Sequence, residues 1–250
     1  MTPQLQIYDD SESLARAAAE RFLSLARMAV ALRGKFLVAL AGGSTPERLY
    51  TLLASPEYAS RVPWGCTFLF WGDERLVPLS DPDSNFGLVQ RTLLSGVSVP
   101  KEQVFPVPTE LSTPEESADA YEQTLRRVLG NTPVFDLVLL GLGDDGHTAS
   151  LFPGLPALTE TERLVVATPP GVLPPPHPRV TLTFPAINAA RQVLFLVSGQ
   201  KKRVRLTSWL AGDSAVNTLP VQGVAPTAGE LWVYADRAAA GNRRAADART

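Results

Sequence analysis

A glycine-rich segment at residues 141–150 carries the side chains best suited to acid–base chemistry. It follows an apolar run and contains His147, one of two histidines in the chain. Because histidine titrates near neutral pH, His147 is a candidate general acid/base, and Asp145 could set its tautomer. A structural or capping role for His147 is the alternative. The second histidine, His177, lies between two prolines and is interpreted as a loop residue.

A second glycine-rich turn, at residues 41–46, has the features of an anion site. Its two glycines allow a ligand to approach the backbone closely, and the turn leads into a predicted helix whose free N–H groups favour negative charge. The turn lacks the Gly-Lys-Ser/Thr of a P-loop and the Gly-x-Gly-x-x-Gly of a dinucleotide site. An ordinary tight turn with an N-cap is the alternative. The candidate phosphate-binding residues of this turn are Gly42, Gly43, Ser44 and Thr45.

Charged residues follow the apolar run at residues 67–71. Asp73, Glu74 and Arg75 come just after its end, and a polar segment continues to Asn85. Ligands of open α/β sheets bind beyond the carboxyl ends of the strands, so we expect at least one of these side chains to face a ligand. Arg75 could grip a phosphate or keep a catalytic carboxylate ionised. A solvated loop with an unremarkable ion pair is the alternative.

Other kinds of site find little support in the sequence. Asp144, Asp145 and His147 could contact a hard cation, but no second histidine or cysteine lies at ligand spacing, so we expect no metal and no cofactor. The Gly-x-Ser-x-Gly motif of a serine hydrolase is absent. The single cysteine, Cys66, excludes an intramolecular disulfide and is expected to be a small buried residue.

Alternating strands and helices must position these loops. The predicted strands are short apolar runs at residues 36–40, 67–71, 135–140, 164–167, 180–184, 193–197 and 231–234. The predicted helices cover residues 11–32, a segment starting at residue 44 or 45, and residues 85–94, 113–129 and 200–210. This alternation predicts an α/β fold with a mostly parallel sheet and helices on both of its faces.

The pattern also predicts details of the first two helices. Ser11 is expected to cap the first one, whose buried face would carry Leu14, Phe22, Leu25 and Met28. Ser44 or Thr45 is expected to cap the second, with Pro46 in its first turn.

The composition is that of one globular domain. Of 250 residues, 45% are apolar and 19% are charged, and the net charge of −2 argues against a nucleic-acid partner. The N-terminus lacks the pattern of a signal peptide and the apolar runs are too short to span a membrane, so we expect a soluble, cytoplasmic protein, acting as a monomer. We expect the domain to cover residues 1–237, with residues 238–250 as a frayed or disordered tail.

Several motifs, in order along the chain, resemble those of the 6-phosphogluconolactonase family. They are Ala-Gly-Gly-Ser-Thr-Pro at residues 41–46, Asp-Glu-Arg at 73–75 with Ser-Asn at 84–85, the segment 141–153, Arg-Val-Thr-Leu-Thr-Phe-Pro at 179–185 with Ile-Asn at 187–188, and Ser-Gly-Gln-Lys-Lys at 198–202. The resemblance implies a single-domain, three-layer, Rossmann-like fold. It also implies hydrolysis of 6-phospho-D-glucono-1,5-lactone to 6-phosphogluconate, a step of the oxidative pentose phosphate pathway.

The resemblance implies roles for individual residues. His147 would be the catalytic base, with Asp145 beside it and Asp73 as a further catalytic carboxylate. Arg75 and Asn85 would line the sugar pocket. The substrate phosphate would be surrounded by Gly42, Gly43, Ser44, Arg179 and Lys202. Lys202 matches the family's lysine better than Lys201, whose alternative is a solvated helix face.

Two other functions stay open. The related glucosamine-6-phosphate deaminases share the fold together with Asp73 and Asp145, but they carry a carboxylate shortly after the histidine. This chain has Phe152 in that stretch, which favours the lactonase. A non-catalytic sugar-phosphate sensor is the third possibility, although we find no helix-turn-helix candidate.

Overall fold

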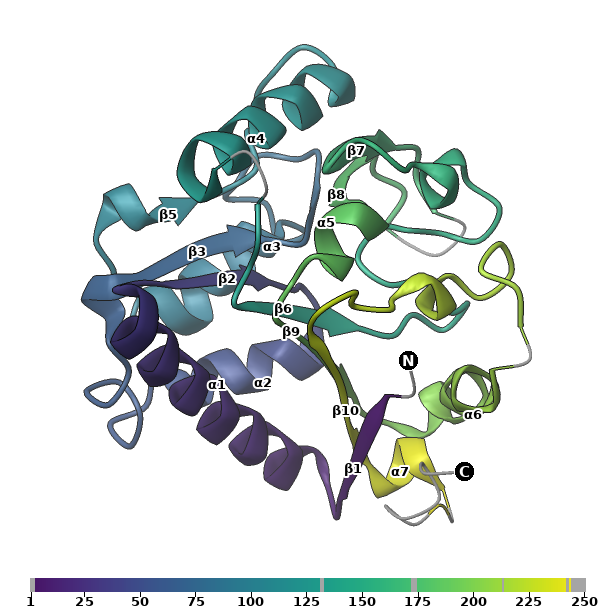
Figure 1. Ribbon diagram of the computed structural model, residues 1–250, viewed down its shortest axis with the longest axis horizontal. Coiled ribbons are helices and arrows are strands. Elements are labelled where there is room, and N and C mark those ends of the chain that lie inside the picture. The colour runs from purple at the N-terminus through teal and green to yellow at the C-terminus, as the bar shows by residue number, and fades with distance from the viewer. Residues whose placement is uncertain (1–2, 131–132, 172–174, 213, 242, 244–250) are drawn as a thin grey trace.

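The computed structural model describes residues 3–130, 133–171, 175–212, 214–241 and 243. Its centre is a seven-stranded sheet with the order β1-β10-β9-β6-β2-β3-β5, in which all strand pairs are parallel (Figure 1). The strands are β1 Gln4–Tyr8, β2 Phe36–Leu40, β3 Thr67–Trp71, β5 Val104–Phe105, β6 Leu137–Gly141, β9 Gln192–Val197 and β10 Glu230–Asp236. The predicted parallel α/β sheet is confirmed.

Continuous apolar runs form the central strands because both faces of the sheet are covered. All of β2 is buried, and so is β6 except for its last residue. The edge strands β1 and β5 are mostly half-buried or exposed. The sequence pattern predicts neither of them, since a short and partly exposed run lacks the apolar signature.

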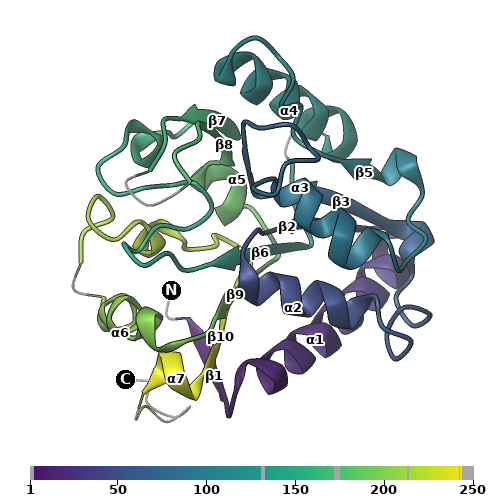
Figure 2. The same ribbon diagram turned by 180° about the vertical axis from the view of Figure 1, so that it is seen from behind.

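Helices lie on both sides of the sheet (Figures 1 and 2). α1 Ser11–Arg33 and α2 Ser44–Leu53 pack side by side on one side of β1 and β10, and α6 Arg203–Ala211 and α7 Arg237–Ala240 lie on the other. The remaining helices are α3 Asn85–Val89, α4 Pro114–Leu129 and α5 Phe184–Asn188, and a π-helical turn, Gln90–Leu94, continues α3. One continuous hydrophobic core joins the layers, so the described residues form a single three-layer domain.

The start of α1 differs from the prediction. Asp10, and not Ser11, is the capping residue, because its Oδ1 accepts the main-chain N–H of Ser13 at 2.8 Å. The buried face of the helix also ends differently. Met28 is 48% exposed, since Ala29 takes the buried position of that turn, whereas the predicted core residues Leu14, Phe22 and Leu25 are buried.

The start of α2 also differs. Gly43 is its N-cap, with a φ of 100°, so Ser44 and Thr45 lie inside the first turn and no side chain caps the helix. A positive φ of this size favours glycine. The first-turn N–H groups of α2 are therefore left for a ligand or for water.

Part of the predicted sheet forms a second, smaller sheet instead. Its strands are β4 Asp73–Arg75, β8 Arg179–Leu182 and β7 Val165–Thr168, in that spatial order and antiparallel. The prediction of a polar loop from residue 72 to 84 is therefore wrong for β4. The strand predicted at 180–184 ends at Leu182, because α5 begins at Phe184 with Pro185 in its first turn.

Two buried tyrosines hold the carboxyl ends of neighbouring strands. Tyr50 of α2 donates its O–H to the carbonyl oxygen of Ala41 at 2.7 Å and accepts the N–H of the same residue at 3.0 Å. Tyr121 of α4 makes the same two contacts with Trp71, at 2.9 and 2.7 Å. Burial raises the pKa of both phenols, so they stay neutral and can donate and accept together. The site loops thus depart from fixed strand ends.

Two smaller predictions, on Cys66 and on the C-terminal tail, differ from the structure. Cys66 ends a 3₁₀ turn, Trp64–Cys66, and is half-buried instead of fully buried. The expected tail begins inside α7, where Ala239 and Ala240 are buried, and residues 242 and 244–250 of it lie outside the described residues.

Candidate functional site

A pocket of about 390 Å³ opens where β2, β6 and β9 end. This is the edge at which open α/β sheets bind ligands. The glycine turn and the histidine loop therefore face one cavity. The predicted site residues in its wall are Gly42, Gly43, Ser44, Thr45, Asp73, Arg75, His147, Arg179 and Lys202.

Two predicted site residues lie behind that wall. Asp145 does not line the pocket, and its carboxylate contacts the ring of His147. Asn85 is 1% exposed and packs against Gly42, and its Nδ2 donates to the carbonyl oxygen of Asp73 at 2.8 Å. The structure therefore places Asn85 as a support of the pocket and not in its lining.

His147 is held by Asp145. Nδ1 of the ring lies 2.6 Å from Oδ1 of Asp145, and the same oxygen accepts the main-chain N–H of His147 at 3.0 Å. Burial alone would raise the pKa of Asp145, but the hydrogen bonds and the charge of His147 lower it overall. An ionised Asp145 accepts a proton-bearing Nδ1, which leaves Nε2 as the basic nitrogen.

Close packing fixes the position of the His147 ring. A β-carbon on Gly143 would lie 2.1 Å from Nδ1, and the centroid of the Phe152 ring lies 4.7 Å from that of His147. The N–H of Gly143 donates to the carbonyl oxygen of His147 at 2.8 Å and closes the turn. The sequence singles out the glycine-rich turn, but it does not show that Gly143 makes room for the imidazole.

Ser150 joins the histidine loop to Asp73. Its Oγ donates to Oδ2 of Asp73 at 2.6 Å, and its N–H donates to Oγ1 of Thr181 at 3.1 Å. Nη1 of Arg179 lies 4.0 Å from the same Asp73 oxygen. Asp73 is therefore engaged by neighbouring groups at the pocket wall. Ser150 has no role among the residues predicted from the sequence, and only its polar type within the 141–153 motif could have pointed to it.

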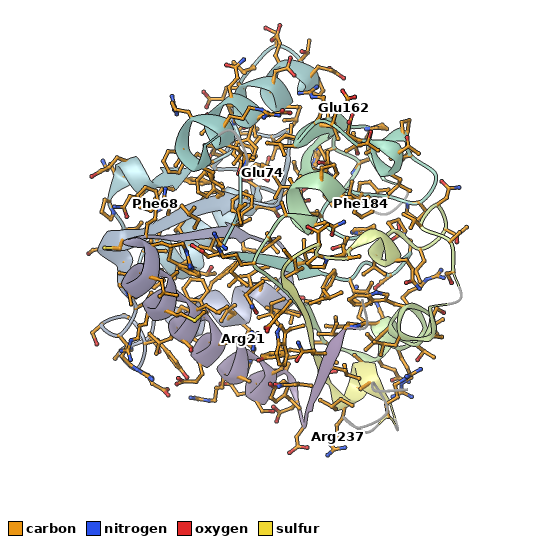
Figure 3. All side chains as sticks on the ribbon, viewed as in Figure 1. Arg21, Phe68, Glu74, Glu162, Phe184 and Arg237 are labelled. Atoms are coloured by element: carbon orange, nitrogen blue, oxygen red, sulfur yellow. The ribbon has the colours of Figure 1, made fainter. Side chains whose placement is uncertain are left out.

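Glu74 organises the chain behind the pocket. Its carboxylate accepts the main-chain N–H groups of Arg75 at 2.8 Å, Asn85 at 2.7 Å and Phe86 at 2.7 Å, and the hydroxyl of Ser84 at 3.1 Å. Figure 3 shows Glu74 among the interior side chains, and it is 1% exposed. Burial raises the pKa of Glu74, and the three main-chain bonds oppose that rise. This carboxylate ties β4 to the start of α3.

Two arginines stand side by side in the pocket wall, because Arg75 of β4 pairs with Arg179 of β8. Arg179 is 5% exposed, and this burial lowers its pKa. The charge of Asp73 raises the pKa of Arg179 and the charge of Arg75 lowers it, and the overall shift is downward. An arginine stays charged even so, since its ordinary pKa lies far above neutrality. The pair forms a fixed positive wall suited to an anionic ligand.

Lys202 reaches the pocket from the turn before α6. Its Nζ lies 2.5 Å from Oδ1 of Asp144, which also lines the pocket. Lys201 is exposed and does not line it. The structure thus places Lys202, and not its neighbour, in the wall of the pocket.

Two kinds of feature are absent from the described residues. No group of three or more histidine, cysteine, aspartate or glutamate side chains among them could hold a metal ion. No helix in this part of the chain is both long and apolar enough to cross a membrane.

Known proteins resemble this chain over nearly its whole length. The model of the family "Glucosamine-6-phosphate isomerases/6-phosphogluconolactonase" matches residues 9–233. A 6-phosphogluconolactonase of Synechocystis is 39% identical over 243 residues, which are 95% of this chain and 98% of that protein.

Solved structures agree with these matches. The 6-phosphogluconolactonase of Trypanosoma brucei superposes with a TM-score of 0.85 at 30% identity, over 97% of this chain and 99% of that one. A monomeric glucosamine-6-phosphate deaminase, at 21% identity and a TM-score of 0.81, over 96% of this chain and 100% of that one, shares the fold. The chain therefore belongs to the family of glucosamine-6-phosphate isomerases and 6-phosphogluconolactonases.

Proposed function

We propose that this chain hydrolyses 6-phospho-D-glucono-1,5-lactone to 6-phosphogluconate, and that His147 is its general base. The observation that carries the proposal is one pocket lined by His147, by the glycine turn of α2 and by Arg75, Arg179 and Lys202. An imidazole with a basic Nε2 supplies the proton transfers of ester hydrolysis, and the positive groups suit the phosphate of the substrate.

The reaction follows from this arrangement. Nε2 of His147 takes a proton from a water molecule, and the resulting hydroxide attacks the C1 carbonyl. Asp145 stabilises the imidazolium that forms. The tetrahedral intermediate then collapses, the bond from C1 to the ring oxygen breaks, and His147 returns the proton to that oxygen. The products are the carboxylate and the free hydroxyl of the opened sugar acid, with one proton released as the acid ionises.

The oxyanion needs donors at the pocket wall. The N–H of Gly143 is already bonded to the carbonyl oxygen of His147, so it is not available. The uncapped first turn of α2, entered through Gly43, keeps its N–H groups directed outward from the helix end. Of the two glycine-rich turns at the pocket, the one at residues 42–43 is therefore the better candidate for the oxyanion site.

Positive groups and the helix end hold the phosphate in this proposal. Ser44, Thr45, Arg179 and Lys202 line the pocket together with Arg75, which would face the sugar in this proposal. Fixing the phosphate orients C1 relative to His147, which accelerates the reaction beyond the proton transfer itself. Asp73, bonded to Ser150, helps to set the position of Arg179.

The test is the replacement of His147 by Gln or Ala, with lactone disappearance corrected for spontaneous opening. We expect kcat to fall about 10²- to 10⁴-fold, the usual range for loss of a general base. A folded variant with near wild-type kcat would remove His147 from this role. Thermal unfolding with and without 6-phosphogluconate checks that each variant folds and still binds.

The deaminase alternative is tested in the same samples by ammonia release from glucosamine 6-phosphate. Phe152, 3% exposed and packed on the His147 ring, stands in the stretch where that reaction needs a carboxylate. We expect no ammonia. Ammonia release at a rate comparable with lactone opening would favour the deaminase.

We further propose a monomeric, cytoplasmic enzyme whose catalytic domain is residues 1–237. Among the described residues the large exposed hydrophobic side chains are few, namely Met28 and Leu32 on α1, Leu111 and Val204, which gives little surface for a stable dimer. Light scattering of the purified chain tests the monomer, and deletion of residues 238–250 without loss of activity tests the boundary.

A further inference from the structure

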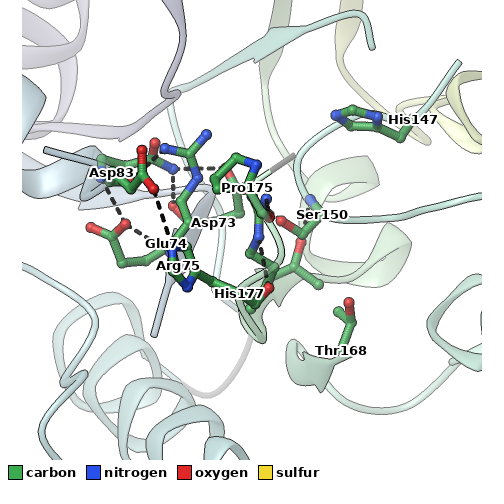
Figure 4. Close-up of polar contacts among 12 residues, drawn as sticks. Asp73, Glu74, Arg75, Asp83, His147, Ser150, Thr168, Pro175 and His177 are labelled. Carbon is green, nitrogen blue, oxygen red and sulfur yellow. Dashed lines mark hydrogen bonds and ion pairs between the residues drawn. The ribbon is translucent and has the colours of Figure 1, made fainter. Parts of the chain in front are cut away.

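His177 and Asp83 join two segments that flank the pocket. Nε2 of His177 lies 3.1 Å from Oδ2 of Asp83, and both side chains are partly exposed, at 32% and 46%. His177 precedes β8, and Asp83 lies between β4 and α3. Figure 4 shows the two residues beside Arg75, apart from His147. Neither side chain lines the pocket itself.

Both residues present a main-chain oxygen to a pocket arginine. The carbonyl oxygen of Asp83 accepts Nη1 of Arg75 at 2.6 Å. The carbonyl oxygen of His177 accepts Nε of Arg179 at 3.1 Å, and that of Pro175 accepts Nη2 at 3.0 Å. The contact between the two side chains therefore fixes the distance between the two carbonyl groups that aim the arginines.

The two arginines need such support because they repel each other. They are opposite each other in the pairing of β4 with β8. The carboxylate of Asp73 lies 4.0 Å from the guanidinium of Arg179. A guanidinium on a flexible stem binds an anion best when its fork is already oriented. Carbonyl oxygens held in place provide that orientation without neutralising the positive charge.

We propose that His177 and Asp83 are positioning residues that orient Arg75 and Arg179 for the anionic substrate. The inference rests on the proposed function, in which these arginines bind the substrate. Neither His177 nor Asp83 touches the substrate or the reacting atoms. Their effect is on substrate binding and not on proton transfer, since His147 has separate supports in Asp145 and Gly143.

Loss of the contact between His177 and Asp83 should make the side chains of Arg75 and Arg179 less ordered without separating β4 from β8. The N–H of Leu76 still donates to the carbonyl oxygen of Pro178 at 2.9 Å, and the β4–β8 pairing stays. Partly exposed ion pairs contribute little energy, so we expect His177→Ala and Asp83→Ala each to raise KM about two- to five-fold with kcat unchanged.

Steady-state kinetics on freshly made lactone test the pair through a double-mutant cycle. The H177A/D83A double variant should show the KM of either single variant, because each substitution removes the same contact. His177→Gln should restore most of the binding, since its amide N–H can still donate to Asp83. Glu57→Ala is the matched control, because it removes an ion pair of similar exposure, with Arg16 at 2.9 Å, away from the pocket. An unchanged KM in H177A, or a double variant equal to the product of the singles, would overturn the proposal.

A second measurement separates this inference from the proposed function. The Nε–H signals of Arg75 and Arg179 in the ligand-free protein, assigned through Arg→Lys variants, report the order of both guanidinium groups by NMR. We expect them to broaden or shift in H177A and D83A and to stay unchanged in E57A. If the wild type fails to open the lactone but these signals respond, the lactonase fails and the positioning stands. Unaltered signals in both variants would refute the positioning whatever the activity.

Discussion

The α-carbon of Gly42 lies directly against the side chain of Asn85. A β-carbon on Gly42 would stand 1.8 Å from Oδ1 of Asn85, far inside any permitted contact. Gly42 is absent from the residues with positive φ, in contrast to Gly43. The first glycine of the turn is therefore required by this close approach, and the second by its backbone conformation.

Gly42→Ala should displace the glycine turn and weaken substrate binding. Asn85 is anchored to Asp73 and cannot move away freely, so the turn must shift instead. We expect KM to rise about tenfold or more, a change typical of losing an oriented anion site. The measurement is KM for the lactone together with competition by inorganic phosphate.

Two further variants show whether the clash is the cause. G42A/N85A should recover part of the lost binding, because the obstructing amide is gone. Gly65→Ala, where a β-carbon meets nothing within 4 Å, should behave as wild type. A double variant as impaired as G42A alone would show that Asn85 is not the obstacle.

Gly143→Ala should impair the chemical step instead. Its β-carbon would lie 2.1 Å from Nδ1 of His147, so the ring must leave its position beside Asp145. We expect kcat to fall about 10²-fold or more, as for loss of a general base, while phosphate still competes with wild-type strength. Equal losses in kcat and in phosphate affinity would contradict this division between the two turns.

The sequence predicts the parts of this protein that depend on continuous local patterns. The buried runs of β2 and β6 and the long amphipathic helix α1 are of this kind, as is the glycine turn before α2. The placement of loops at the carboxyl ends of parallel strands then brings His147 and the glycine turn to one pocket. That much follows from the geometry of an α/β sheet.

Contacts between distant segments do not follow from such patterns. In the sequence, nothing distinguishes Glu74 from the neighbouring charged residues. In the structure it is buried, and its carboxylate is hydrogen-bonded to the start of α3. Asn85 carries a polar amide and is expected to line the pocket. In the structure Gly42 lines the pocket, and Asn85 packs against it from behind. Both outcomes depend on the contacts between β4 and the start of α3, which only the tertiary structure reveals.

Asp144 should tune the affinity of the phosphate site. Its carboxylate lies 2.5 Å from Nζ of Lys202, so Asp144 already neutralises this lysine. Asp144→Asn should lower KM about two- to five-fold, because a partly exposed ion pair of this kind is weak and the freed ammonium attracts the substrate dianion. Lys202→Ala should raise KM.

Salt dependence provides the check on Asp144. Raising ionic strength from about 50 to about 300 mM should shrink the difference between Asp144→Asn and wild type, since screening weakens exposed charges. A higher KM in Asp144→Asn at low salt would instead show that Asp144 holds Lys202 in its working position.

Asp145 should make the stability of the protein depend on acid pH. Its pKa is depressed below the ordinary value of 3.8, chiefly because the bonds to His147 outweigh the effect of burial. A depressed carboxyl pKa stabilises the fold above the ordinary value, and that stabilisation disappears as the pH falls through the depressed value. Asp145→Asn keeps an acceptor for His147 but loses the charge. The free energy of unfolding in urea should therefore be lower for Asp145→Asn than for wild type at about pH 5 to 7, and the two should converge as the pH falls through the depressed pKa. A difference that stays constant across this range would mean that the carboxylate charge does not hold the histidine loop.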